Sequence, residues 1–260
     1  MRQFAEMWSF RHFLMALVRL DLRQKYSRSA LGLGWSVIQP AAFSAVFVLV
    51  FSQVLNTSPA TYMVTLLIGL AVWNFFRECA VSGCLAFVSH ESYIRQRPLP
   101  YGLYSARNVI GYAIHASFAF AVALVAVVLV NGHAEHLLTL WAVVPILLMI
   151  LVAGWAVATI FAFAQVYFHD TKHLLEVLTQ MLFFLTPIVY PPSLLVNKGL
   201  GWLARFNPLN VYLELVRYPL TTGELPDAKL VAYGLAFTAL LVGMALATIS
   251  AFQKRLVFRM

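Results

Sequence analysis

The sequence of 260 residues is poor in charge, and acidic residues are the scarcest. Asp and Glu together number 10, and charged residues make up 11% of the chain, whereas 62% of the residues are hydrophobic. A soluble domain usually has about 25% charged residues to cover its surface. We therefore expect an integral membrane protein.

Clustered carboxylates are absent as well. Asp21, Asp170 and Asp227 are the only aspartates, and they lie far apart in the sequence. A membrane prenyltransferase needs paired or clustered carboxylates to hold Mg²⁺ on its diphosphate substrate, so this class is disfavoured. The histidines form no HExxH motif, and we predict no metal site.

Two further motifs are missing. No GxxxxGKS/T phosphate loop occurs, and the stretch GLGWS (Gly32–Ser36) lacks both the lysine and a preceding strand. The chain is therefore not expected to hydrolyse ATP itself. The only cysteines, Cys79 and Cys84, fit neither a CxxC motif nor a disulfide scaffold, and we interpret them as packing residues.

Long runs without charged residues mark the membrane spans, because a helix needs about 20 apolar residues to cross the hydrocarbon core. The longest run, residues 29–76, exceeds one span and is divided by the turn-forming NTSPAT (Asn56–Thr61). We predict an all-α integral membrane protein with six transmembrane helices. They are expected at residues 36–55, 62–88, 106–131, 139–166, 174–190 and 228–252.

The positions of Lys and Arg predict the topology. Of the 18 cations, thirteen fall in segments that the spans place on one side, and three fall on the other side. Because Lys and Arg favour cytoplasmic loops, we expect both termini in the cytoplasm. This bias and anionic lipid headgroups explain the net charge of +8 without nucleic acid. The thirteen lie in residues 1–35, 89–107, 167–173 and 253–260.

An amphipathic helix is expected before the first span. His12, Arg19 and Arg23 share one side, as in a helix that lies in the membrane plane on anionic headgroups; a simple topology anchor is the alternative. Asp21 falls on the apolar side, which favours a protein partner there over lipid. The apolar side consists of Met7, Phe10, Phe13, Leu14, Leu17 and Leu20.

Residues 187–227 are too apolar for a solvated loop and contain too many prolines for one straight crossing. Short re-entrant helices that are buried against protein in the outer leaflet satisfy both conditions, and we predict them before the last span. No internal repeat is evident, which argues against a secondary transporter built from inverted repeats.

Arg77 and Glu78 are the only acidic or basic residues in the central part of a predicted span. Neighbouring helical residues point about 100° apart, so we expect the two to be poor partners for each other. They have structural roles at a helix end or between subunits, or they line a polar path. Ion-driven transport needs more intramembrane ionisable groups, so energy for any transport is expected from another chain.

The stretch RLDLRQKYSRSALGLGWSVIQPAAFSAVFVLVFSQVL (Arg19–Leu55) resembles the start of ABC-2 type permeases that export lipid-linked polysaccharides such as O-antigen and teichoic acid. Three further stretches agree with this family in order and spacing, so that the resemblance covers nearly the whole chain. They are LLIGLAVWNFFRE (Leu66–Glu78), YIRQRPLPYGLYSARNVI (Tyr93–Ile110) and LTPIVYPPSLL…FNPLNVYLELVRYPLTTGELP (Leu185–Pro226).

The resemblance implies a transport permease, not an enzyme, in the bacterial inner membrane. It implies a homodimer resting on two copies of a separate ABC subunit that binds ATP and Mg²⁺, with no cofactor in this chain. The polysaccharide would pass between the two permease copies. Alternatives are a capsular or teichoic acid polymer exporter, a drug or lipid ABC-2 permease and, least favoured, an integral-membrane glycolipid enzyme.

The resemblance divides the chain into a cytoplasmic part, residues 1–35, and an ABC-2 transmembrane domain, residues 36–260. The first part would hold an interface helix for the ATPase and a basic Leu-Gly loop where lipid-linked pyrophosphate enters. Glycine backbone, cations and the amides of the next helix suit a phosphate; a topology determinant with a helix cap at Ser29 or Ser36 is the alternative. The entrance residues are Arg23, Lys25, Tyr26, Arg28, Ser29, Leu31, Gly32 and Gly34.

The loop at residues 89–104 would form a coupling helix that seats in a groove of the ATPase. Charge and a rigid turn would help to transmit movement, whereas an ordinary positive loop is the alternative. The coupling residues are Glu91, Tyr93, Arg95, Arg97 and Pro98.

A polysaccharide conduit is also implied. Aromatic rings hold the apolar faces of sugars without trapping hydrogen bonds, although Trp and Tyr also collect at membrane interfaces for other reasons. The conduit residues are Trp35, Trp73, Phe75, Phe76, Arg77, Glu78, Tyr104 and Tyr190.

Overall fold

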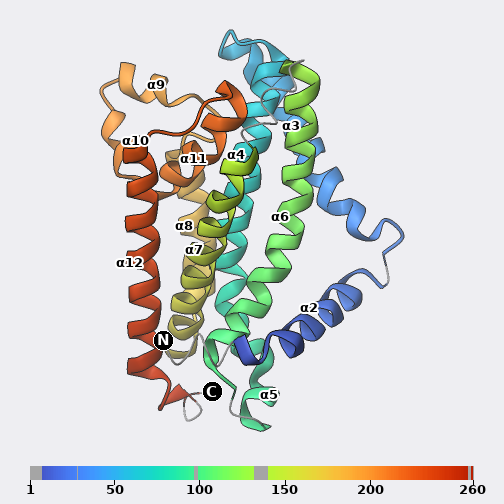
Figure 1. Cartoon of the computed structure of the whole chain (residues 1–260), viewed down its shortest axis with the longest axis vertical. Helices are drawn as coiled ribbons and strands as arrows, with labels where there is room; N and C mark the ends of the chain where they lie inside the picture. Colours follow the sequence, from blue (N-terminus) through green and yellow to red (C-terminus); the bar gives the residue numbers. More distant parts are fainter. Residues whose placement is uncertain (1–7, 28, 97–98, 132–139, 257–258, 260) are drawn as a thin grey trace.

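The computed structural model describes residues 8–27, 29–96, 99–131, 140–256 and 259. Within these residues every secondary-structure element is a helix. Long helices run side by side along the molecule, and short helices lie at both of its ends (Figure 1). The expected all-α membrane fold is confirmed.

Five helices of the described part are long and apolar enough to cross a membrane. The remaining expected span, 174–190, the fifth in chain order, is shorter: α8 (Thr171–Leu185) has 15 residues, or about 22 Å. It ends because Thr186 precedes Pro187 and adopts an extended backbone, as residues before proline do. The five long helices are α3 (Trp35–Val54), α4 (Pro59–Val81), α6 (Tyr101–Asn131), α7 (Leu140–Tyr167) and α12 (Ala228–Phe252).

The second span also ends earlier than expected, at Val81 instead of residue 88. The chain continues as two 3₁₀ turns, η2 (Gly83–Ala86) and η3 (Val88–His90), followed by α5 (Glu91–Gln96). A side chain on Gly83 would come within 2.8 Å of the Ala158 Cβ, so glycine allows η2 to pack closely against α7. The predicted loop thus contains a short helix and the first turn of α6.

α4 is the central helix of the chain, with 78% of its most apolar window buried, against 11% for α3 and 17% for α12. It packs against α6, α7 and α11 (Pro208–Thr222), while α3 and α12 lie at the edges. Gly154 of α7 lets the Phe75 ring approach, because a Cβ there would lie 2.6 Å from Cε1. Close packing of this kind drives helix association in membranes.

The apolar residues of α2 (Arg11–Tyr26) divide into two groups, whereas we predicted a single apolar side. Leu14 and Val18 are buried against the bundle, where α2 packs on α6. Phe13 and Leu20 are exposed and free to enter a membrane, as an interface helix requires. Met7, assigned to the same apolar side, lies outside the described residues.

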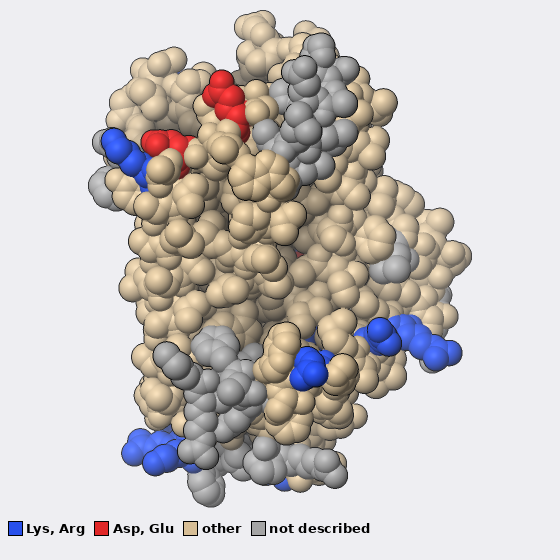
Figure 2. Space-filling view, in the orientation of Figure 1, with Lys and Arg blue, Asp and Glu red and all other residues tan. Residues whose placement is uncertain are grey.

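Short helices form the end of the molecule opposite α5 (Figure 1). α9 (Pro192–Asn197), α10 (Gly201–Phe206) and α11 match the short helices expected between residues 187 and 227. Polar contacts fix this region: the Tyr62 hydroxyl donates to the Val189 carbonyl oxygen at 2.7 Å, and Asn207 Nδ2 donates to Thr186 Oγ1 at 2.8 Å. On the face shown in Figure 2, charged groups lie at the two ends, and the band between them is almost uncharged.

Candidate functional site

The turn between α2 and α3 exposes its backbone at Gly32. Gly32 has a φ of +51°, and a side chain there would meet no atom within 4 Å. Its amide donates to Ser29 Oγ at 3.2 Å, and the Gly34 amide donates to the Leu31 carbonyl oxygen at 2.8 Å. Arg23, Lys25 and Leu31 are exposed, whereas Arg28 lies outside the described residues.

Neither serine of this region caps α3. The residue at the N-cap is Gly34, and no side chain accepts a hydrogen bond there. The expected serine cap is therefore absent from α3, although Ser29 accepts a hydrogen bond from the Gly32 amide in η1 (Gly32–Gly34). The alternative of a topology determinant stays a prediction. Ser36 instead directs its hydroxyl to α6.

His115 of α6 joins the end of α2 to the start of α3. Its Nδ1 lies 3.0 Å from the Tyr26 hydroxyl and 2.9 Å from Ser36 Oγ. Lys25 Nζ lies 3.5 Å from Nε2 of the same ring. His115 is not among the predicted site residues, because it belongs to no metal-ligand motif; a lone histidine in an apolar span is itself a signal for a functional site.

The polar contacts continue from α6 to α4. Tyr112 lies three residues before His115, and its hydroxyl interacts with Ser82. Ser82 Oγ donates to Glu78 Oε2 at 2.7 Å, and Glu78 also acts electrostatically on His115. We call this series the polar strip. Its members are Lys25, Tyr26, Ser36, His115, Tyr112, Ser82, Glu78 and Arg77.

Arg77 and Glu78 do pair with each other, contrary to expectation. Arg77 NH1 lies 3.5 Å from Glu78 Oε1, because both side chains are long enough to meet although they leave the helix in different directions. The shorter contact of Glu78 is the one with Ser82. Both side chains are nearly half exposed, so they are accessible to a polar path.

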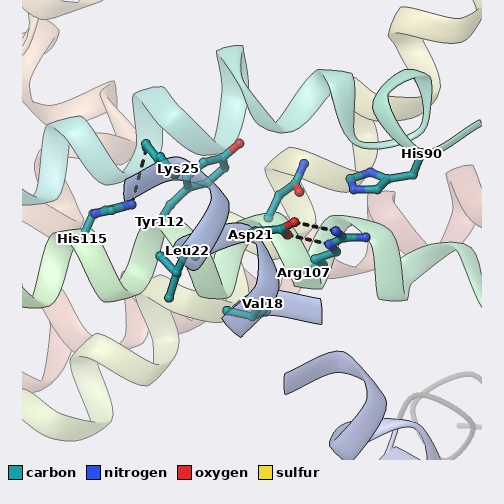
Figure 3. Close-up of a pocket in the computed structure, with 10 residues that line it drawn as sticks. Val18, Asp21, Leu22, Lys25, His90, Arg107, Tyr112 and His115 are labelled. Atoms are coloured by element: carbon teal, nitrogen blue, oxygen red, sulfur yellow. Dashed lines mark hydrogen bonds and ion pairs between the residues drawn. The ribbon is translucent and has the colours of Figure 1, made fainter. Parts of the chain in front are cut away.

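A pocket of about 190 Å³ lies between α2 and α6 (Figure 3). Lys25 and His115 lie at one end of it, and the ion pair of Asp21 with Arg107 lies at the other. Gly111 leaves the pocket open, since a side chain at this position would meet no atom within 4 Å. The polar strip thus adjoins an open space that is lined by cations and hydrogen-bond donors.

His90 lines the same pocket from η3. Burial lowers the pKa of His90, and the charge of Arg107 lowers it further; a hydrogen bond to the Ala86 carbonyl and the Asp21 carboxylate act in the opposite direction. The ring is therefore largely neutral at pH 7. Its Nδ1 lies 2.8 Å from the Ala86 carbonyl oxygen and donates to it, which leaves Nε2 as an acceptor.

The coupling residues that the structure describes lie on α5. Ile94 is buried and anchors this helix, while Tyr93 is exposed. Glu91 and Arg95 form an exposed ion pair at 2.7 Å. Arg97 and Pro98 lie outside the described residues, and the coupling role of the group stays a prediction.

The aromatic conduit candidates do not share one open surface. Trp35 is exposed and adjoins Ser36 of the polar strip, and Tyr190 is half-buried, with its hydroxyl donating to the Phe184 carbonyl oxygen at 2.7 Å. The remaining rings pack in the core of the chain, so their conduit role stays a prediction. These are Trp73, Phe75, Phe76 and Tyr104.

Known membrane transport proteins are similar to this chain in sequence. The sequence model of a family described as ABC-2 type transporter matches residues 12–221. The O-antigen export system permease protein RfbA of Klebsiella pneumoniae is 26% identical over 196 residues, 75% of each chain. RfbA of Myxococcus xanthus is 26% identical over 254 residues, 96% of this chain and 95% of its own. The polysialic acid transport protein KpsM of Escherichia coli is 22% identical over 236 residues, 89% of this chain and 90% of its own.

Proposed function

The chain belongs to the ABC-2 type transporter family, and from this premise we propose that it is the permease subunit of an ATP-driven exporter of lipid-linked polysaccharide. It is a transport permease and not an enzyme. The names of its relatives support a polysaccharide substrate, since they refer to O-antigen export and to polysialic acid transport. We place the protein in the bacterial inner membrane with both termini in the cytoplasm.

The observation that carries this proposal is the polar strip. It starts beside the Gly32 turn and continues through His115 to Glu78 and Arg77, between helices that are otherwise apolar. A lipid-linked polysaccharide has a phosphate group at the junction of its lipid and its sugar. Such a group needs cations and hydrogen-bond donors when it leaves water, and Lys25, Tyr26 and Ser36 supply them.

Two further observations support a separate ATPase as the partner. No phosphate loop occurs in the sequence, so ATP and Mg²⁺ would be bound by another chain. α5 forms one end of the molecule, and α2 lies near the same end (Figure 1), where both could contact such a chain. We propose two copies of the permease and two of the ATPase, with the polymer passing between the permeases.

A capsular polymer exporter is the second candidate. It is favoured by the similarity to KpsM, whose name refers to polysialic acid transport, over most of both chains. Both candidates share the polar strip and differ only in the polymer.

Deletion of the gene tests the proposal. We expect surface polysaccharide to disappear and lipid-linked polymer to accumulate inside the cell, because synthesis continues while export stops. Surface glycan and lipid-extracted glycan are measured in the deletion strain and after complementation. Normal surface glycan in the deletion strain would contradict the proposal, and the identity of the lost polymer decides between O-antigen and capsule.

Complementation with His115→Ala tests the polar strip itself. A hydrogen bond to a charged group is worth about 1.5 to 3 kcal/mol, so we expect export to fall at least tenfold at unchanged protein amount. His173→Ala is the matched control, because His173 is exposed on α8 and is no member of the strip. Equal export by the two variants would remove His115 from the site.

A further inference from the structure

The ion pair of Asp21 and Arg107 joins two elements that are far apart in the sequence. Arg107 Nε donates to Asp21 Oδ2 at 2.6 Å, and Arg107 NH2 donates to Oδ1 at 2.5 Å. The two residues are 86 positions apart, one on α2 and the other on α6. A bidentate pair of this kind fixes orientation as well as distance.

This pair corrects the expectation for Asp21. We expected a carboxylate on the apolar side of α2 to face a separate protein partner, but its partner is Arg107 of the same chain (Figure 3). Only 7% of the Arg107 side chain is exposed, against 40% for Asp21. A buried guanidinium that loses its carboxylate is left as an unpaired charge, which strongly disfavours opening of the pair.

The ion pair lies near both ends of the coupling region, the predicted coupling loop at residues 89–104. His90, directly before α5, interacts electrostatically with both Asp21 and Arg107. Arg107 is in the second turn of α6, directly after the coupling region. Leu14 and Val18 of α2 are buried on the same side of α2 as Asp21, so apolar packing supports the ion pair.

We propose that the Asp21–Arg107 pair ties α2 to the start of α6, directly after the coupling loop, residues 89–104, so that α2 and the start of α6 move as one body when the ATPase acts. This inference rests on the proposed function. α2 is continuous from Asp21 to Tyr26, and Tyr26 contacts His115 and Ser36 of the polar strip. A displacement of the coupling region therefore reaches the Gly32 turn through α2. Asp21 and Arg107 are positioning residues, since neither has to touch the substrate.

Asp21→Asn tests the proposal in the complex of this chain with its ATPase. The variant keeps the shape of the side chain and removes the charge that holds Arg107. We measure polysaccharide export, ATP hydrolysis and protein amount, and we expect export per ATP hydrolysed to fall about tenfold while hydrolysis continues. A merely structural role would lower the protein amount and leave this ratio unchanged.

Glu176→Gln is the matched control. Glu176 pairs with Lys172 at 3.7 Å on the exposed start of α8, so this variant also removes one carboxylate charge from an ion pair. It should leave export per ATP hydrolysed unchanged. An equal fall in both variants would overturn the proposal, because the effect would then not depend on the link between α2 and α6.

A covalent link provides the stronger test. Asp21→Cys with Arg107→Cys removes the ion pair, and a bifunctional thiol reagent can then join the two positions. Cys79 and Cys84 are fully buried, and the two single variants treated with the same reagent control for modification. We expect the double variant to lose coupling and the cross-link to restore it. Failure of the cross-linked protein to recover would show that α2 must separate from α6, which overturns the proposal.

Hydrogen exchange separates this inference from the proposed function. Amides of α2 should exchange faster in Asp21→Asn than in the parent, whatever the substrate is. If the parent exports no polysaccharide, the proposed function fails, and the exchange data still report on the link. If the parent exports normally and the variant shows faster exchange with unchanged coupling, the inference alone fails.

Discussion

Gly32 shows how a single backbone angle defines the candidate entrance. Its φ of +51° lies in the left-handed region, and its surroundings are open. Most residues lose about 1 to 2 kcal/mol in this conformation, whereas asparagine enters it more readily. The site therefore needs glycine either for the angle or for the bare backbone.

Gly32→Asn and Gly32→Val separate these two needs. If a phosphate approaches the bare backbone, both variants lose export, and only Gly32→Val also loses protein because of strain. Gly199 offers matched controls, since it has a φ of +73° with nothing within 4 Å and lies in the turn after α9. We measure surface glycan and protein amount. Normal export by Gly32→Asn would show that only the backbone angle matters.

The sequence position of Arg217 indicates only on which side of the membrane its charge lies, and not what the side chain contacts. It counts as one of three cations on the outer side, but its side chain is buried within the chain. It contacts Glu214 at 3.2 Å and the Pro187 carbonyl oxygen at 3.3 Å. Gly69 leaves room for the guanidinium, because a Cβ there would lie 3.1 Å from NH2. Arg217 thus joins α11 to α4, which no local pattern predicts.

At the scale of elements, α5 is a short helix with one buried anchor, Ile94, and an exposed polar side. Such a helix can present charge to a partner without changing the core. The resemblance implied a coupling segment here, but it did not give the bounds of α5, Glu91–Gln96.

Arg95→Glu tests the coupling role of α5. The change places a second acidic residue next to Glu91, which costs about 0.2 to 0.5 kcal/mol in the helix itself. We expect loss of ATPase co-purification and of export, with normal membrane insertion. Lys172→Glu is the matched control, because it creates the same like-charge spacing with Glu176 on α8. Unchanged co-purification with Arg95→Glu would refute the coupling role.

At the scale of the whole molecule, the long helices form a membrane body with few acidic or basic residues. α7 contains no acidic or basic residue, and the only one in α12 is Lys229, at its start. The charged residues on the face in Figure 2 lie at the two ends. We therefore expect transport by this protein to depend on movement supplied by a partner.

Reconstitution tests this requirement. The purified permease alone in liposomes should move no lipid-linked polysaccharide under a proton or sodium gradient. Addition of the ATPase with ATP and Mg²⁺ should start transport, and a hydrolysis-deficient ATPase is the control. Movement driven by an ion gradient through the permease alone would contradict the dependence on a partner.

Local features of the chain were therefore predictable from the sequence. The membrane class, five of the six spans, the short outer helices and the turn around Gly32 follow from hydrophobic runs, prolines, glycines and cations. These signals lie within single segments, so their meaning does not depend on how helices pack.

The tertiary structure alone decided which segments meet. Tyr26 and Ser36 reach His115 across 89 and 79 residues, and Asp21 reaches Arg107 across 86. The sequence placed Asp21 on an apolar side of α2, but a single helix does not reveal which neighbour covers that side. Which neighbour covers that side depends on the fit of side chains between helices. In this protein the neighbour is α6, and α2 thereby links the candidate entrance turn to the predicted coupling region.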